Sequence, residues 1–235
     1  MGWWRWCALS GWLLWMPARA ETLRILLGPV PEVIELEADG KTFHGGGIDL
    51  MRAIARRAGM EFEFIAYPQA RAMLLAQQQA DACLPISPLP ERREMFKWTV
   101  PIVPMRLVLL ARSDDPRQLH SLEQARKLRV GAMRGTAVAA RLKQQGLVMD
   151  ESVDYLSGLE KLQLGRLDLW AMLDVGLTSM SRRLGIPQPR VALVVDRVDV
   201  AFACNRQVSD EAMARLNQAI NAMHADGSFK QFDLN

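Results

Sequence analysis

Two segments of the chain carry residues suited to binding a small anion. Ser87 lies just past the apolar run 82–86, and open α/β sheets present their ligand sites at the carboxyl ends of such strands. Its hydroxyl or backbone N–H would donate to a carboxylate, although a serine that only stabilises a turn fits equally well. Gly135-Thr136-Ala137 opens an expected helix, and the free N–H groups of a helix N-terminus favour an anion. Thr136 is at the same time an ordinary N-cap residue.

The sequence offers little of the machinery that catalysis requires. General acid–base chemistry needs a titratable group poised near another one. The three histidines, His44, His120 and His224, are far apart and fall in a turn, a connecting segment and a terminal helix. The sequence contains no His-Cys-Asp cluster with metal-ligand spacing and no Gly-x-Ser-x-Gly motif. We therefore expect a protein that binds its ligand unchanged, with neither metal nor organic cofactor.

The elements that must position these residues alternate between strand and helix. In the first half of the chain, apolar runs predict strands at 23–27, 62–65 and 82–86. Helical spacing of apolar residues predicts helices at 48–58 and 70–79. Such alternation is typical of a parallel sheet whose faces are covered by helices.

The same pattern recurs in the second half. We expect strands at 106–111, 128–132, 153–156 and 167–172, and helices at 121–126, 136–145 and 159–164. The halves share one detail, since Asp81 and Asp168 each lie in a turn from a helix into a strand. The sequence therefore predicts an α/β fold with two similar lobes.

The last elements have no third lobe to join. A strand at 198–204 and a helix at 209–225 are expected to pack back onto the first lobe, which makes two crossings between lobes and so a hinge. Lobe 1 is then formed by residues 21–105 plus 200–235, and lobe 2 by residues 106–199.

Six motifs, in order along the chain, resemble those of one family. They are Gly47-Ile48-Asp49-Leu50 entering a helix, Ala80-Asp81-Ala82, Pro90-Glu91-Arg92-Arg93 before Phe96, Val130 to Thr136, Gly165-Arg166-Leu167-Asp168, and Asn217 to Gly227. Their order is similar to that in the family 3 extracellular solute-binding proteins, the amino-acid-type periplasmic receptors of ABC importers. The resemblance covers essentially all of residues 21–235. It implies the type II periplasmic-binding fold, in which two α/β lobes joined by two strands close about a hinge on a ligand in the cleft.

The resemblance also implies roles for individual residues. Arg92 takes the place of the family's arginine that clamps the ligand carboxylate, because a guanidinium presents two parallel donors and stays charged when desolvated. The alternative is that Arg92 and Arg93 simply solvate a charged loop. Ser87 and the segment at Thr136 would bind the same carboxylate. Tyr67, at the end of the second strand, is expected to stack against the ligand, with a rim or core position as the alternative.

For the ammonium group of an amino acid, the family commonly uses an Asp after the last strand of lobe 2. Asp174 is the nearby acid, but it lies one residue further past Gly165 than the family pattern places it, and Leu173 takes the expected position. A surface or capping role for Asp174 is therefore the alternative. If Asp174 lies outside the cleft, the ligand need not carry an α-amino group, or Glu32 supplies the acid from the cleft edge.

Residues 1–20 are typical of a secretory signal peptide. Arg5 precedes the uncharged stretch 6–17, and Ala18-Arg19-Ala20 matches a cleavage site, so we expect cleavage after Ala20. A membrane anchor is the alternative, but the stretch falls short of the ~20 residues that span a bilayer. Cleavage removes two arginines and no acid, which lowers the formal charge from +3 to +1. A near-neutral mature chain argues against nucleic-acid binding.

Cleavage leaves two cysteines, Cys83 and Cys204. An oxidising compartment permits a disulfide between them. The alternative is two buried thiols that act as small hydrophobic side chains. Sequence alone does not set their distance.

These observations predict a periplasmic receptor. We expect a monomer that captures a small carboxylate-bearing solute, an amino acid above all, and delivers it to an ABC permease in the inner membrane. One alternative is a periplasmic enzyme on the same fold, of the hydrolyase kind, because fold does not fix function. The other is a ligand-sensing protein that acts through a membrane partner.

Overall fold

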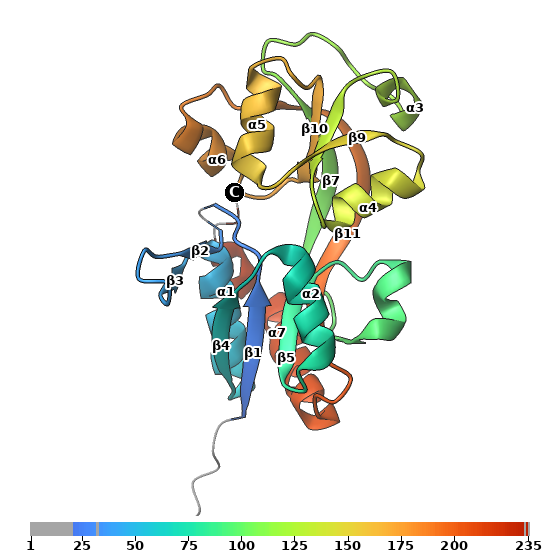
Figure 1. Ribbon diagram of the computed structural model, residues 1–235. Coiled ribbons are helices and arrows are strands. Elements are labelled where there is room, and N and C mark those ends of the chain that lie inside the picture. Colours follow the sequence, from blue (N-terminus) through green and yellow to red (C-terminus); the bar gives the residue numbers. More distant parts are fainter. Residues whose placement is uncertain (1–20, 32, 233, 235) are drawn as a thin grey trace, which may run out of the picture.

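The computed structural model describes residues 21–31, 33–232 and 234, so the expected signal peptide lies outside the described residues. Figure 1 shows two lobes, one above the other, connected by β7 (Val103–Ala111) and β11 (Arg190–Cys204). These two strands pair antiparallel along their length, from Arg190 opposite Ala111 to Val200 opposite Val103. The expected fold class, two α/β lobes joined by two hinge strands, is confirmed.

Lobe 1 is built around three parallel strands. β1 (Thr22–Leu27) lies between β4 (Glu61–Ala66) and β5 (Ala82–Ile86), and the end of β11 pairs antiparallel with β5. Successive residues of a strand point to opposite faces of the sheet. Ile25 therefore packs against α1 (Gly46–Ala58) and α7 (Asp210–Asp226), whereas Leu26 packs against α2 (Gln69–Gln78). Short elements complete the lobe: β2 (Glu35–Leu36), β3 (Phe43–His44), η1 (Pro90–Met95), β6 (Lys97–Trp98) and η2 (Ser228–Gln231).

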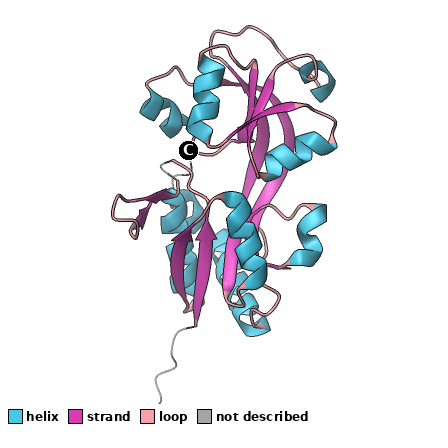
Figure 2. Ribbon diagram, viewed as in Figure 1, coloured by secondary structure: helices cyan, strands magenta, loops and turns pink. Residues whose placement is uncertain are grey.

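Lobe 2 repeats the arrangement on the other side of the hinge strands. Its strands are β8 (Val130–Met133), β9 (Met149–Ser152) and β10 (Leu169–Leu173), in the spatial order β7-β10-β8-β9. Its helices are α3 (Leu122–Ala125), α4 (Ala137–Gln144), α5 (Tyr155–Gln163) and α6 (Leu177–Leu184). Leu109 packs on the side of α4 and Leu110 on the side of α5 and α6, so helices cover both faces (Figure 2).

The structure corrects the expectation for residues 153–156. These residues do not form a strand, and α5 begins at Tyr155 instead, because the Asp154 carboxylate accepts a hydrogen bond from the Ser157 N–H (2.8 Å) and caps the helix. The strand lies earlier, at β9, and pairs parallel with β8.

Two further elements differ from the expectation. β11 begins at Arg190, well before residue 198, because register shifts at Val191/Leu193 and Val194/Asp196 break the period-two pattern that would have revealed it. The helix α6, which lies between the capping residues Gly176 and Gly185, was not predicted from the sequence. Both glycines have positive φ (67° and 63°), a conformation that few other residues adopt.

The aspartate shared by the two halves has an equivalent partner in each lobe. The Arg24 guanidinium of β1 donates to Asp81 (Nε–Oδ1 2.9 Å), and that of Arg129, just before β8, donates to Asp168 (Nε–Oδ2 3.0 Å). Backbone hydrogen bonds join the same pairs, Arg24 N to Asp81 O and Asp168 N to Arg129 O. Each pair therefore fixes the start of one parallel strand against its neighbour. The hydrogen bonds from Arg129 lower the pKa of Asp168 to about 2.

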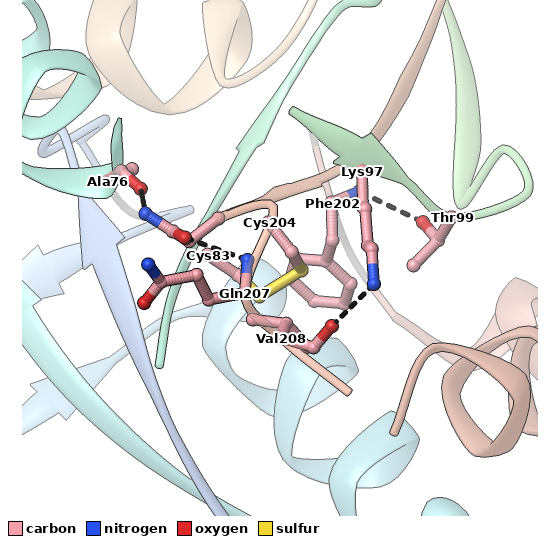
Figure 3. Close-up of a disulfide and its surroundings, with 9 residues drawn as sticks. Ala76, Cys83, Lys97, Thr99, Phe202, Cys204, Gln207 and Val208 are labelled. Carbon is pink, nitrogen blue, oxygen red and sulfur yellow. Dashed lines mark hydrogen bonds between the residues drawn. A yellow bond between two sulfur atoms is a disulfide. The ribbon is translucent and has the colours of Figure 1, made fainter. Parts of the chain in front are cut away.

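A disulfide joins two neighbouring strands of lobe 1. Cys83 of β5 and Cys204 of β11 lie opposite one another in the strand register and are bonded within the buried core (Figure 3). Beside them, the Lys97 ammonium donates to the Val208 carbonyl oxygen (2.8 Å). Because both cysteines belong to one lobe, the bond leaves hinge motion free.

Loss of the disulfide is expected to lower the free energy of unfolding by roughly 2–5 kcal/mol. The bond joins residues 121 positions apart, and its loss releases that long loop in the unfolded chain. Urea unfolding of Cys83→Ala/Cys204→Ala, compared with the oxidised wild type, measures the effect. An unchanged midpoint at an unchanged slope would contradict the expectation.

Asp168→Asn is expected to lower the free energy of unfolding by about 1–2 kcal/mol at pH 7, after allowance for the exposure of Arg129. Because the folded-state pKa of this carboxyl is lowered from 3.8 to about 2, its contribution is complete above about pH 4 and is lost as the pH falls towards 2. Urea unfolding of both proteins between pH 7 and pH 2 should show the difference disappearing. Asp114→Asn, at an exposed ion pair, is the control. A difference that persists at pH 2 would refute the assignment.

Candidate functional site

A cavity of about 160 Å³ lies between the two lobes. Its walls come from β1, the segment after β1 and α1 in lobe 1, from the starts of α4 and α5 and the end of β10 in lobe 2, and from both hinge strands. Most of the wall is apolar. The polar side chains among the described lining residues are Gln69, Ser87, Arg92, Thr136 and Tyr155.

Arg92 is the charged residue of this wall in the described part of the chain. It belongs to η1, the first helical turn after β5, and is only 6% exposed, whereas its neighbours Glu91 and Arg93 face solvent. Its guanidinium makes no hydrogen bond or ion pair with any described residue, and burial lowers its pKa from the ordinary value. A buried cation without a counter-ion is costly, and a guanidinium is shaped to bind a carboxylate through two parallel hydrogen bonds. The position is therefore suited to an anionic ligand.

Ser87 and Thr136 line the same cavity from opposite lobes. Ser87 is 4% exposed, and its hydroxyl has no hydrogen-bond partner among the described residues. The Thr136 hydroxyl is occupied, since it donates to the Met133 carbonyl (2.8 Å) and accepts from the Ala139 N–H (3.2 Å). What α4 offers a ligand is therefore its first backbone N–H groups, which have no partner within the helix.

Asp174 and Tyr67 do not line the cavity. Both oxygens of the Asp174 carboxylate accept hydrogen bonds from Arg106, one from the backbone N–H (2.6 Å) and one from Nε (2.5 Å). Leu173 lines the cavity instead. Tyr67 packs beside the lobe 1 core, with the Arg71 guanidinium 5.4 Å from its ring centre. Glu32, the other candidate acid, lies outside the described residues.

Two polar lining residues, Tyr155 and Gln69, were not predicted from the sequence. Each is the first residue of its helix, α5 and α2. Burial raises the pKa of the Tyr155 hydroxyl to about 12, and that hydroxyl makes no hydrogen bond to a described residue. For Tyr155 the sequence did contain a signal. Asp154 directly precedes it, and an Asp at that position is typical of the N-cap of a helix.

The two lobes touch around the cavity. Arg183 of α6 forms an ion pair with Glu35 of β2, and the Gly176 N–H donates to the Leu234 carbonyl oxygen (3.0 Å). Leu234 also lines the cavity. At Gly135, an added Cβ would lie 3.4 Å from the Cβ of Ala70, so the turn before α4 lies against α2. The cleft is therefore closed, and a solute would enter by hinge opening.

None of the described helices is long and apolar enough to cross a membrane. The described residues contain no group of three or more His, Cys, Asp and Glu side chains arranged to hold a metal ion.

Two α/β lobes closed on a cavity by antiparallel hinge strands define the type II periplasmic-binding fold, and solved structures share it. A histidine kinase sensor domain with similarity to periplasmic binding proteins has a TM-score of 0.78 at 21% identity, covering 90% of this chain and 94% of that one. The ancestral amino acid-binding protein AncCDT-1, a precursor of cyclohexadienyl dehydratase, has a TM-score of 0.73 at 17% identity, covering 89% and 92%. Holo ArgBP from T. maritima has a TM-score of 0.71 at 16% identity, covering 89% and 95%.

The chain belongs to the bacterial extracellular solute-binding proteins, family 3, whose model matches residues 30–233. The expected family is thus confirmed. A comparison with curated proteins gave no significant match.

Arg92→Met is expected to raise the free energy of unfolding of the ligand-free protein by roughly 0.5–2 kcal/mol, because methionine keeps an apolar stem and removes a buried charge that no described residue pairs with. Urea unfolding measures the effect. Arg93→Met, at the exposed neighbouring position, is the matched control and should change stability by less than ~0.5 kcal/mol. A loss of stability in Arg92→Met would mean that the guanidinium has a partner in the ligand-free protein.

Proposed function

We propose that this protein is a periplasmic receptor that encloses a small carboxylate-bearing solute and delivers it to an ABC permease in the inner membrane. The observation that carries the proposal is Arg92, a buried guanidinium in the wall of the interlobe cavity that makes no hydrogen bond or ion pair with any described residue. A bound carboxylate neutralises this charge and accepts its two parallel hydrogen bonds.

The remaining donors favour a ligand that bridges the lobes. Ser87 presents its hydroxyl from lobe 1, and the first N–H groups of α4, at Thr136, face the cavity from lobe 2. A carboxylate has lone pairs enough for Arg92 and both of these groups. Because the ligand then contacts both lobes only when they are together, its binding energy stabilises the closed conformation.

The composition of the cavity wall favours binding without catalysis. Its titratable side chains in the described part of the chain are Arg92 and Tyr155. Proton transfer near neutral pH is most effective with a group whose pKa lies near that pH. The pKa of Tyr155 is raised to about 12, and an arginine stays charged. The site therefore lacks, among these residues, a side chain suited to general acid–base work.

The proposed transport role rests on the family and on the first residues of the sequence. The family is one of extracellular solute-binding proteins, and residues 1–20 have the charge and hydropathy pattern of an export signal. Closure of the lobes changes the face presented to a membrane protein, which gives a permease the means to distinguish the loaded receptor from the empty one. The similar sensor domain uses the same fold, so a membrane-bound signalling partner is the alternative to a permease.

Two classes of solute fit a carboxylate site. One comprises α-amino acids, which the name of one similar structure mentions. The other comprises carboxylic acids without an ammonium group.

A bound carboxylate is expected to raise the melting temperature of the purified protein. A ligand at 100 times its dissociation constant adds about 2.7 kcal/mol, which for a chain of this size corresponds to roughly 5–11 °C. Thermal unfolding with panels of L-amino acids, small peptides, organic acids and polyamines measures the shift. The shift should vanish in Arg92→Met and persist in Arg93→Met. If no carboxylate shifts the transition, the receptor proposal fails and turnover assays follow.

A further inference from the structure

The cavity wall distinguishes the two classes of carboxylate. Apart from the five polar side chains already named, the described wall is built from glycine, proline and aliphatic side chains, among them Val33 and Met51 of lobe 1 and Leu173 and Val175 of lobe 2. Those of Met51 and Val175 are buried, so the part of a ligand that extends away from Arg92 meets hydrocarbon.

An α-ammonium group would find no counter-charge on the described wall. Among the acids, Asp174 lies nearest in sequence to the lobe 2 wall. Both of its carboxylate oxygens already accept hydrogen bonds from Arg106. Leu173, the last residue of β10, lines the cavity, whereas Asp174, the residue after the strand, contacts Arg106 of the hinge strand β7.

The position of such an ammonium group adds a second cost. In an α-amino acid, the ammonium lies one carbon away from the carboxylate. If Arg92 binds the carboxylate, the ammonium is held within a few ångströms of the guanidinium, beside a side chain that is itself buried in the cavity wall. A desolvated charge without a partner is unfavourable, and a like charge nearby makes it more so.

We infer that the preferred ligand is an aliphatic or aryl carboxylic acid that lacks an α-ammonium group. The inference rests on the proposed function, since it takes the carboxylate site at Arg92 as given. The cavity of about 160 Å³, below the roughly 300–1,000 Å³ of common ligand pockets, restricts the ligand to a small acid.

The experiment compares each amino acid with the same molecule lacking its amino group. Isothermal titration calorimetry on the purified protein uses two pairs, L-leucine with 4-methylpentanoate and L-phenylalanine with 3-phenylpropanoate. In at least one pair, the acid without the amino group is expected to bind at least tenfold more tightly, equivalent to ~1.4 kcal/mol. Arg92→Met should abolish this binding and Arg93→Met should retain it.

The outcomes separate the inference from the proposed function. Equal or tighter binding of the amino acid overturns the inference while leaving a carboxylate receptor in place. Because the titration uses the whole protein, a counter-charge from any residue, Glu32 and Asp233 included, would appear as that preference. If neither these ligands nor any carboxylate of the thermal panel binds, the proposed function itself fails.

A gain-of-function variant tests the physical reason. Leu173 lines the cavity, whereas Asp174 does not, so Leu173→Asp places a carboxylate on the cavity wall. It is expected to shift the preference towards the amino acid by at least tenfold. Leu173→Asn, of similar size and without charge, is the matched control. If the Asp variant folds, as judged by its unfolding transition, and keeps the wild-type preference, a missing counter-charge does not determine specificity and the inference is overturned.

Discussion

A guanidinium enclosed in an apolar cavity without a counter-ion is an unfavourable arrangement for an isolated protein. Arg92, which makes no hydrogen bond or ion pair with any described residue, is held in the cavity wall by η1, which follows β5 after a three-residue connection, while Glu91 and Arg93 face solvent. The energetic cost of an empty site is recovered when an anion enters. The buried charge of Arg92 thus lowers the stability of the empty protein and, for the same reason, raises its affinity for an anion.

The rest of the molecule supplies what this charge requires. Parallel strands bring Ser87 to the carboxyl edge of the lobe 1 sheet, and the hinge strands β7 and β11 bring the N-terminus of α4 opposite to it. The Arg24–Asp81 and Arg129–Asp168 pairs fix the far ends of the strands in both lobes. With those ends fixed, the loops at the other ends are free to form the ligand site on rigid supports.

Local signals made part of this site predictable from sequence. The strand 82–86, the helix start at Thr136 and the motif around Arg92 each depend on a few adjacent residues, and the structure brings Ser87, Arg92 and Thr136 to one cavity. Tyr155 was missed because its segment has strand-like side chains, while the deciding interaction is a single cap from Asp154. The placement of Leu173 rather than Asp174 on the wall depends on strand orientation, where a shift of one residue reverses the face. The pairing of Cys83 with Cys204 depends on a contact across 121 positions, which no local pattern reports.

The course of the chain through the lobes also sets an order of folding. Lobe 2 is formed by one continuous stretch between the hinge strands, so its core assembles from neighbouring elements. Lobe 1 draws on both ends of the chain, because β11 pairs with β5 and α7 packs on α1. A chain is synthesised with its N-terminus first. The edge of β5 and the thiol of Cys83 therefore stay unpaired until β11, which pairs with both, has been synthesised. The half of the molecule that begins the sequence is therefore the half that completes its sheet last, and until then the edge of β5 lacks the strand that pairs with it.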